Sequence, residues 1–381
     1  MKYKLGEICE IISGSTPKTG IPEYWDGTQK WITPAELNED TYIITDSIRK
    51  LTELGVEKAG LSSFPEGTVI LSSRAPIGKV AIAGCEMYCN QGFKNLICSE
   101  KINNHYLYWF LKGRTEYLNS LGRGATFKEI SKQIVSNIEI DVPPIEQQKR
   151  AVNQLEKANA IIQLRKQQLQ KLDELVKARF IELFGDPMTD ISKWSTSTIG
   201  EQFNVTSGGT PATGEKAYWE NGTIPWIGSN MCQDTILSGN DGKFITEEGY
   251  THSSAKWFHK GTVLVALVGA TIGKTALLRF DTTTNQNIAA IDVNNNVAFS
   301  SEFVFYHMQM LYSKFMEIGS GKFKMANQGF IRQLPLICPP IELQDQFAAF
   351  VEQTDKSKSV VQKAFDEAQL LFDSLMQQYF G

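Results

Sequence analysis

An internal duplication limits the folds open to this chain more than any other feature of its sequence. The segment LGEICEIISGSTPKTGIPEYW (Leu5–Trp25) aligns without a gap with IGEQFNVTSGGTPATGEKAYW (Ile199–Trp219), and PPIEQQ (Pro143–Gln148) returns as PPIELQ (Pro339–Gln344). The offset between matching positions drifts only from about 194 to about 197 residues along the chain. One unit is therefore present twice, and each copy is long enough to bury its own core.

The segment LVALVGATIGKTALL (264–278) invites comparison with a phosphate-binding loop. Such a loop needs a glycine, four intervening residues and then Gly-Lys-Ser/Thr, so that backbone amides wrap the phosphates. Counting back from Lys274 places Val268 where the first glycine belongs, and the sister copy has Val80 instead of a hydroxyl residue after Lys79. Both copies keep Ile-Gly-Lys between apolar runs, which predicts a β-hairpin with glycine at its turn. The spacing therefore argues against nucleotide hydrolysis.

The amino-acid composition of each copy changes at its Pro-Pro pair. Before the pair, short apolar runs alternate with Gly, Pro and Ser, which predicts short strands joined by turns, with a few helical segments. After it, about forty residues lack Gly and Pro, which predicts one long helix. We therefore expect an α+β fold with two similar domains, related by a pseudo-twofold duplication, and two long antiparallel coiled-coil helices. The expected boundaries are 1–144 for the first domain, 145–185 for its helix, 186–338 for the second domain and 339–381 for the final helix.

The two long helices carry apolar seams and opposite charge. The first has eight Lys or Arg against five Asp or Glu, a net charge of +3, and the second has three against seven, a net charge of −4. Such helices are expected to pair within the chain, and the alternative is that each lies on its own globular half. At ~1.5 Å per residue, each makes a rod of roughly 60 Å that can hold two heads apart. The seam residues are Leu155, Ile162, Leu169, Val176 and Leu183 in the first helix, and Val361, Phe365, Phe372 and Leu375 in the second.

Groups that carry catalysis or bind metals do not recur in the two copies. The four histidines show no metal-binding spacing. Cys85 and Cys89 lack a second pair at matching spacing, so buried or half-buried thiols are expected. Six cysteines in a chain of this length, without an apolar run of signal-peptide or membrane-spanning type, predict a reduced, cytoplasmic protein with no membrane association.

The copies share polar and cationic residues on loops instead. Hydroxyls, amides, Lys and Arg are the residue types that contact phosphates and read base edges. The net charge of −4 confines any DNA contact to local clusters, because proteins that grip nucleic acid without partners are basic overall. Alternatively, these shared residues have a structural role, in loops capped by their own hydroxyls. The candidate DNA-binding residues are Ser15, Thr16, Lys18, Arg74, Lys79, Asn90, Gln91, Arg123, Lys128 and Lys132 in the first copy, and Thr210, Thr213, Lys216, Lys274, Asn285, Gln286, Lys322, Lys324 and Arg332 in the second.

In combination these features resemble the specificity subunit of type I restriction–modification systems. The resemblance rests on SGSTP/SGGTP, IGK, NQ, PPIEQQ/PPIELQ and ARFIELFGDP, and it covers nearly the whole chain. It implies two target-recognition domains that each read one half of a bipartite double-stranded DNA target, while the helices set the gap and dock two modification subunits. Those partners would bind S-adenosylmethionine and methylate adenine by base flipping. A restriction subunit, an ATP-driven motor and nuclease, would join for cleavage, and this chain would hold no catalytic centre, cofactor or metal.

Two other functions remain open on the sequence alone. A coiled-coil scaffold with two protein-binding heads would share this architecture without reading DNA. An enzyme with an unrecognised centre would methylate DNA by itself. If the chain does read DNA, the valine at position 268 in place of an equivalent of Arg74 indicates that the two domains read different sequences.

Overall fold

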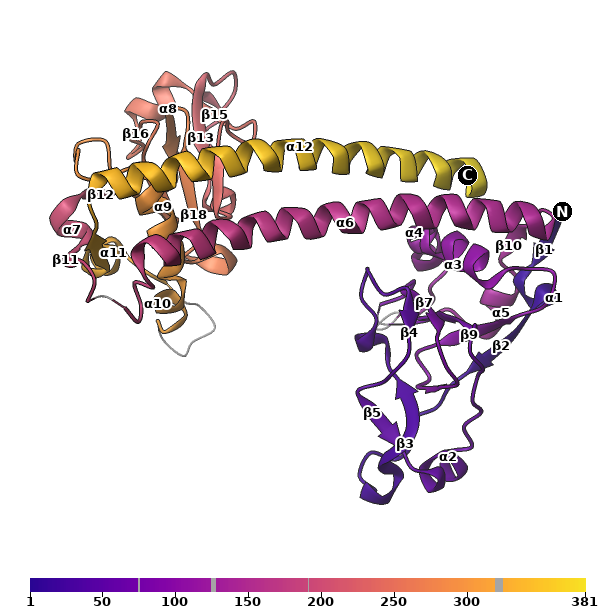
Figure 1. The fold of residues 1–381 in the computed structure, drawn as a ribbon. Helices are drawn as coiled ribbons and strands as arrows, with labels where there is room; N and C mark the ends of the chain where they lie inside the picture. The colour runs from indigo at the N-terminus through magenta and orange to yellow at the C-terminus, as the bar shows by residue number, and fades with distance from the viewer. Residues whose placement is uncertain (75, 125–127, 191, 319–324) are drawn as a thin grey trace. The chain divides into compact units, whose positions relative to one another are not determined.

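The computed structural model describes residues 1–381 except 75, 125–127, 191 and 319–324. The described residues form two compact units, one made of Met1–Lys166 with Lys363–Gly381 and the other of Gln167–Gln362. Each unit holds one copy of the duplicated sequence together with part of each long helix (Figure 1). The long helices are thus shared between the units rather than forming segments of their own.

The first unit combines a five-stranded sheet in the order β2-β9-β6-β7-β4, a three-stranded sheet in the order β5-β3-β8 and the pair β1-β10. Its strands are β1 (Lys2–Lys4), β2 (Cys9–Ser13), β3 (Trp25–Ile32), β4 (Ile43–Ile44), β5 (Arg49–Leu51), β6 (Val69–Leu71), β7 (Val80–Ala83), β8 (Tyr88–Cys89), β9 (Lys94–Cys98) and β10 (Glu139–Asp141). Its shorter helices are α1 (Leu5–Ile8), η1 (Pro22–Tyr24), η2 (Pro34–Glu36), α2 (Glu53–Ala59), α3 (Asn104–Lys112), α4 (Thr115–Ser120) and α5 (Lys132–Ser136).

The second unit repeats this plan with the sheets β12-β20-β17-β18-β14 and β15-β13-β19-β16 and the pair β11-β21. Its strands are β11 (Ser195–Thr198), β12 (Asn204–Ser207), β13 (Ile224–Ile227), β14 (Thr235–Leu237), β15 (Phe244–Ile245), β16 (Trp257–Phe258), β17 (Val263–Ala266), β18 (Thr275–Leu278), β19 (Thr282–Thr284), β20 (Ile288–Asp292) and β21 (Pro335–Cys338). Its shorter helices are α7 (Ile199–Gln202), η3 (Lys216–Tyr218), η4 (Ser229–Met231), α8 (Glu247–Thr251), η5 (Gly269–Thr271), α9 (Ser301–Met310), α10 (Tyr312–Met316) and α11 (Gln328–Gln333).

The predicted Ile-Gly-Lys hairpin is confirmed in both units. β6 pairs with β7, and β17 pairs with β18, each pair antiparallel. Gly78 and Gly273 at the two turns have φ angles of +94° and +76°. Such angles are easy for glycine and costly for residues with a Cβ atom, which explains why glycine stands here in both copies.

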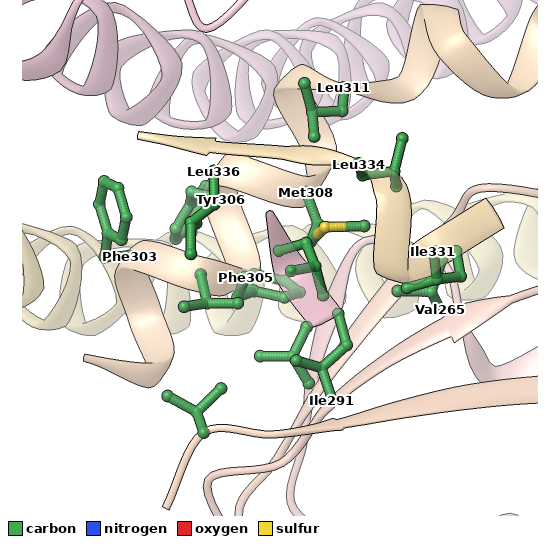
Figure 2. Close-up of a cluster of buried hydrophobic side chains, with 14 of the residues drawn as sticks. Val265, Ile291, Phe303, Phe305, Tyr306, Met308, Leu311, Ile331, Leu334 and Leu336 are labelled. Atoms are coloured by element: carbon green, nitrogen blue, oxygen red, sulfur yellow. The ribbon is translucent and has the colours of Figure 1, made fainter. Parts of the chain in front are cut away.

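A buried helix lies beside the five-stranded sheet in each unit. In the second unit, Phe303, Phe305 and Met308 of α9 share a core with Val265 of β17 and Ile291 of β20 (Figure 2). In the first unit, the corresponding α3 has six consecutive buried residues, from 106 to 111. The helix is apolar on nearly all sides because the sheet covers one face and the long helices cover another, as the contact of Trp109 with Phe372 shows.

The long helices are α6 (Ile145–Phe184) and α12 (Ile341–Phe380), and they run antiparallel where they meet within each unit. In the first unit, the Tyr379 hydroxyl donates a hydrogen bond to the Gln154 side chain. In the second unit, the Lys358 ammonium lies 2.6 Å from the Asp173 carboxylate. Of the predicted seam residues, Leu155, Ile162 and Val176 are buried, and Leu169, Leu183, Val361, Phe365, Phe372 and Leu375 are half-buried.

A buried glutamine anchors the start of each long helix to its unit. Gln148 accepts a hydrogen bond from the Asn103 amide (2.8 Å) and donates to the Lys101 and Pro143 carbonyls. Gln344 makes the same three bonds in the second unit, accepting from the Ser300 amide (2.9 Å). The last residue of PPIEQQ and PPIELQ is therefore glutamine because one side chain satisfies three backbone groups at once.

Candidate functional site

Four segments of the first unit meet at one end of its five-stranded sheet. The Ser15 amide donates to the Cys89 carbonyl (3.1 Å), the Ser73 amide to the Gly92 carbonyl (2.7 Å), and the Ile130 amide to the Ser73 carbonyl (2.9 Å). Backbone hydrogen bonds therefore tie together segments that lie far apart in the sequence. We call them the Ser-Gly loop (13–17), the Asn-Gln loop (90–92), the edge segment (73–74) and the bridging segment (128–131), and together the loop frame.

The second unit builds the same loop frame from its own copy. The Gly209 amide donates to the Thr284 carbonyl, the Leu267 amide to the Asn287 carbonyl, and the Ala326 amide to the Leu267 carbonyl, each at 2.8 Å. The corresponding segments are 207–211, 285–287, 267–268 and 325–328. The structure thus brings the sequence-predicted SGxTP and NQ motifs together in both units.

A threonine–glutamine hydrogen bond joins the first two segments in each frame. The Thr16 hydroxyl donates to the side-chain carbonyl of Gln91, and the Thr210 hydroxyl donates to that of Gln286 at 2.6 Å. A Cβ atom on Gly14 would lie 1.9 Å from the Cys89 carbonyl oxygen, so only glycine allows the two segments to approach this closely. The candidate pairs Thr16/Gln91 and Thr210/Gln286 therefore act as units rather than as separate side chains.

The two asparagines of the Asn-Gln loops shape their own turns. The Asn90 side chain accepts from the Gly92 amide (2.8 Å), and the Asn285 side chain accepts from the Asn287 amide (3.1 Å). Each therefore forms an Asx turn with the backbone two residues later. These bonds explain the asparagine in both copies, and they leave the neighbouring glutamine exposed at the loop tip.

A pair of tryptophans, absent from the predicted site residues, supports each Ser-Gly loop. The Trp31 ring nitrogen donates to the Ser15 carbonyl (3.0 Å), and the Trp226 ring nitrogen donates to the Gly209 carbonyl (3.1 Å). Trp31 and Trp226 meet Trp25 and Trp219, respectively, edge to face at 5.2 Å. The signal was present, since Tyr-Trp closes the first aligned segment in both copies.

Two predicted DNA-binding lysines are committed to partners within the chain. The Lys79 ammonium donates to the Pro34 carbonyl at 2.9 Å and to the Leu37 carbonyl. The Lys274 ammonium lies 2.6 Å from the Asp234 carboxylate. Both lysines hold the hairpin to a neighbouring segment, so their charges are engaged within the chain.

Other predicted cations of the first unit lie on its surface. Lys18, Lys128 and Lys132 are exposed. Arg123 is exposed as well, and its backbone exchanges two hydrogen bonds with Glu129 of the bridging segment (2.9 and 3.0 Å). Cations therefore gather beside the loop frame although the whole chain is acidic.

The remaining predicted residues of the second unit differ in their surroundings. Thr213 and Lys216 are exposed, and Lys216 lies 3.6 Å from Glu220. The Arg332 guanidinium donates to the Val205 carbonyl (2.6 Å) and to the Gln328 side chain. Lys322 and Lys324 lie outside the described residues.

A cavity of about 410 Å³ opens within the loop frame of the second unit. All four segments contribute to its walls, among them Ser207, Gln286, Val268 and Met325. Lys256, an exposed residue next to β16, adds a cation that is absent from the predicted site residues, because the first copy has Ser62 at the matching position.

Two buried cysteines and the acidic and histidine side chains complete the description of the titratable groups. Burial raises the pKa of the Cys89 and Cys232 thiols to about 12, so neither is a thiolate at neutral pH. Among the described residues, no group of three or more His, Cys, Asp or Glu side chains is placed to hold a metal ion. Within the same part of the chain, neither the two long helices nor any shorter one has the apolar length needed to cross a bilayer.

Comparison with known proteins places both copies in one family. Residues 1–174 and 191–364 each match the type I restriction modification DNA specificity domain. The MjaIX specificity subunit of Methanocaldococcus jannaschii is 32% identical over 310 residues, which are 76% of this chain and 71% of that protein. The EcoR124I/EcoR124II specificity subunit of Escherichia coli is 31% identical over 114 residues, 29% of this chain and 27% of that protein.

Solved structures share the fold over the full length of the chain. The type I restriction–modification S subunit of M. genitalium aligns with a TM-score of 0.60 at 15% identity, covering 100% of this chain and 96% of that one. A chain from a study of assembly and conformational transition in a type I restriction–modification system aligns with a TM-score of 0.59 at 18% identity, covering 100% and 97%. With its DNA specificity domain found twice and a relative of 32% identity over three quarters of its length, the chain belongs to the type I restriction–modification specificity subunit family.

Proposed function

We propose that this chain reads a bipartite DNA sequence, with one loop frame on each half of the target. One observation carries the proposal: a frame with the same backbone hydrogen bonds, the same Thr–Gln pair and a neighbouring tryptophan pair occurs once per unit, in a chain of the DNA specificity family. Exposed hydroxyls and amides at a rigid loop edge are suited to base edges. The exposed cations Lys18, Arg123, Lys128 and Lys132 are suited to phosphates.

In this proposal the chemistry belongs to other chains. Relatives are named specificity subunits, and one fold relative comes from work on the assembly of a type I restriction–modification complex. We assign S-adenosylmethionine binding and adenine methylation to two modification subunits, and ATP-driven cleavage to restriction subunits. This chain would supply no cofactor site of its own, and its work on chromosomal DNA would take place in the cytoplasm.

Exposed apolar residues on the long helices support docking of two identical partners. Leu164 and Leu175 of α6 correspond to Val360 and Leu371 of α12, because the helices align without a gap at the offset that joins PPIEQQ to PPIELQ. Their exposed fractions are 58%, 48%, 71% and 53%, respectively. The two residues on each helix lie about three turns apart, and so on one face. A single exposed leucine is normal on a protein surface and does not indicate a binding site. A pair repeated by the duplication, in contrast, indicates two equivalent docking surfaces.

Continuous helices that belong to both units can also act as a spacer. Each of α6 and α12 has 40 residues and contributes to both compact units. A change in helix length would then change the gap between the half-sites without touching either loop frame. The helices would therefore set the gap, while the loops set the bases.

A mobility-shift assay with modification subunits present separates DNA reading from a scaffold role. We expect a preference for one bipartite sequence, with affinity that falls steeply as salt rises, because Lys and Arg contacts release counterions from phosphates. Replacing Arg123 by Ala should lower the slope of log affinity against log salt by about 1. The matched control is Lys149→Ala on α6, which should leave the slope unchanged. Binding without sequence preference would favour the scaffold.

A further inference from the structure

The two loop frames carry different side chains at three neighbouring positions. An isolated antiparallel bridge joins Arg74 to Glu129 in the first unit and Val268 to Met325 in the second. Lys94 is the third residue of the first set, placed opposite Ser13 in the strand register. Its counterpart is Ala289, opposite Ser207. The same backbone thus carries Arg, Lys and Glu in one unit and Val, Ala and Met in the other.

In the first unit these three side chains form a charged cluster. The Lys94 ammonium, on a side chain only 8% exposed, lies 3.3 Å from one Glu129 oxygen and 3.3 Å from the Ser73 hydroxyl. The other Glu129 oxygen lies 4.0 Å from the Arg74 guanidinium, whose side chain is 39% exposed. One carboxylate therefore serves two cations. A guanidinium has five N–H donors, so Arg74 is oriented by Glu129 and keeps donors available at the surface.

The second unit shows that the fold does not need these charges. It keeps the edge-to-bridging hydrogen bond, from Ala326 to Leu267, with apolar side chains at all three positions. Burying an ammonium such as that of Lys94 is expensive, and a buried ion pair is weak evidence for a stabilising role. The backbone hydrogen bonds of the frame therefore form both with and without the charged cluster.

The apolar set of the second unit presents a different surface. Met325 is 67% exposed, although a large apolar side chain gains by burial. Both Met325 and Val268 line the 410 Å³ cavity of this frame, beside the side chain of Gln286. A flexible thioether at the rim of an open cavity suits a small apolar group on a ligand.

We propose that these three positions decide which base each unit reads at one position of its half-site. This inference rests on the proposed DNA-reading function. In the first unit, Arg74 faces the Glu129 carboxylate that Lys94 binds, and it donates to O6 and N7 of a guanine, the pairing that guanidinium geometry favours in the major groove. In the second unit, Met325 and Val268 contact the C5-methyl group of a thymine, the one apolar feature on that groove surface.

Substitution toward the sister copy tests the guanine contact without risking the fold. In the full chain assembled with modification subunits, Arg74→Val should reduce discrimination for G·C at one position of one half-site by about 5- to 160-fold. The other half-site should stay unchanged. Replacing that guanine with 7-deazaguanine should weaken binding of the unmodified protein and have no effect on the Arg74→Val protein. Uniform weakening across all sequences would overturn the proposal, because it would make Arg74 a phosphate contact.

A matched test addresses the thymine contact. Replacing thymine with deoxyuridine removes only the C5-methyl group, and at one position of the second half-site this should cost the unmodified protein about fourfold in affinity. The Met325→Ala protein should lose that sensitivity. If no thymine-to-uracil change in that half-site affects binding, the apolar part of the proposal is wrong.

Two controls separate the possible failures. The triple variant Arg74→Val, Lys94→Ala, Glu129→Met carries the second unit's set, and its melting temperature should stay within about 2–4 °C of the parent, the shift that ~1 kcal/mol produces in a unit of this size. A larger drop would show that the cluster serves the fold and would contradict the proposal. A parent complex with no sequence preference at all would instead refute the underlying DNA-reading function.

Discussion

At the residue scale, a buried polar residue of one copy is not always repeated in the other. His307 of α9 is fully buried, and its Nε2 contacts the Pro335 carbonyl at 2.9 Å, while Nδ1 has no hydrogen-bond partner. Burial lowers the pKa of His307 to about 4, because a charged ring would be desolvated. The matching residue of α3 in the first unit is Phe110, also buried. The second unit therefore carries a titratable group at a place where the first unit carries a ring that cannot titrate.

This difference predicts a pH-dependent stability. The unfolded chain binds a proton at His307 with a pKa near 6.5, above the folded value, so acid favours unfolding. The contribution of His307 is complete above about pH 6.5 and is lost as the pH falls toward 4, by up to about 3 kcal/mol. His307→Phe should flatten this part of the stability curve, measured by urea unfolding between pH 7 and 4.5.

The exposed His252 supplies the control for that measurement. His252→Phe should keep the acid sensitivity of the parent protein, because the substitution leaves the buried His307 in place. If His307→Phe and the parent lose stability in parallel between pH 6.5 and 4.5, the buried neutral histidine is not the cause.

At the scale of elements, helices and hairpins were predictable, but the meeting of the loops was not. The long helices and the Ile-Gly-Lys hairpin follow from local composition and periodicity. The seam pattern missed Phe180, Phe184 and Phe347, which are buried in the core of the second unit and break the strict heptad. A local pattern sees only neighbours in sequence, whereas these rings are placed by tertiary contacts.

The loop frame itself depends on pairings that span much of a unit. β3 pairs with β8 in parallel, and the two-residue strand β4 pairs in parallel with β7. β4 and β8 have two residues each, too few to show a periodicity, so the sequence could name the SGxTP and NQ motifs without showing that they touch. The sequence also indicates Lys79 and Lys274 as candidate DNA contacts, because an internal carbonyl or carboxylate partner leaves no mark on residue type.

Docking on the long helices gives the first prediction at this scale. Replacing Leu164 and Leu175 by Asp, both on the exposed face of α6, should reduce the modification subunits bound from two to one, counted by native mass spectrometry. The cause is the charge placed on one of the two repeated apolar surfaces. Leu370→Asp is the control. Leu370 is also exposed, but it corresponds to Glu174 in the other copy, so it does not belong to a repeated apolar pair. Two bound subunits in the double variant would contradict the assignment.

Helix length gives the second prediction at this scale. Deleting residues 163–169 and 359–365, one heptad at matching places of α6 and α12, should shorten the spacer by about 10 Å, equivalent to about three base pairs. The gap in the recognised sequence should change while the bases in each half stay the same, as read by methylation mapping. Deleting the heptad from only one of the two helices should break the helix pairing and abolish assembly. An active complex with an unchanged gap would show that the helices are not the spacer.

At the scale of the whole molecule, duplication explains the division of labour. Two copies of one unit, with loop frames built on the same hydrogen bonds but carrying different side chains, can read two different half-sites. A chain of net charge −4 has little general attraction to DNA, so specificity has to come from these local surfaces and from partners that add affinity. Each unit should then be exchangeable without effect on the other.

Domain exchange followed by genome-wide mapping of methylated adenines tests this account most directly. Residues 1–141 are replaced by the matching segment of a relative with a known target, and the chain is expressed with its modification subunits. We predict that one half of the methylated sequence becomes that of the relative, while the other half and the gap remain as in the parent. Exchange of 198–338 should produce the mirror result. A change in both halves after either single exchange would contradict the central claim that each unit reads its own half-site.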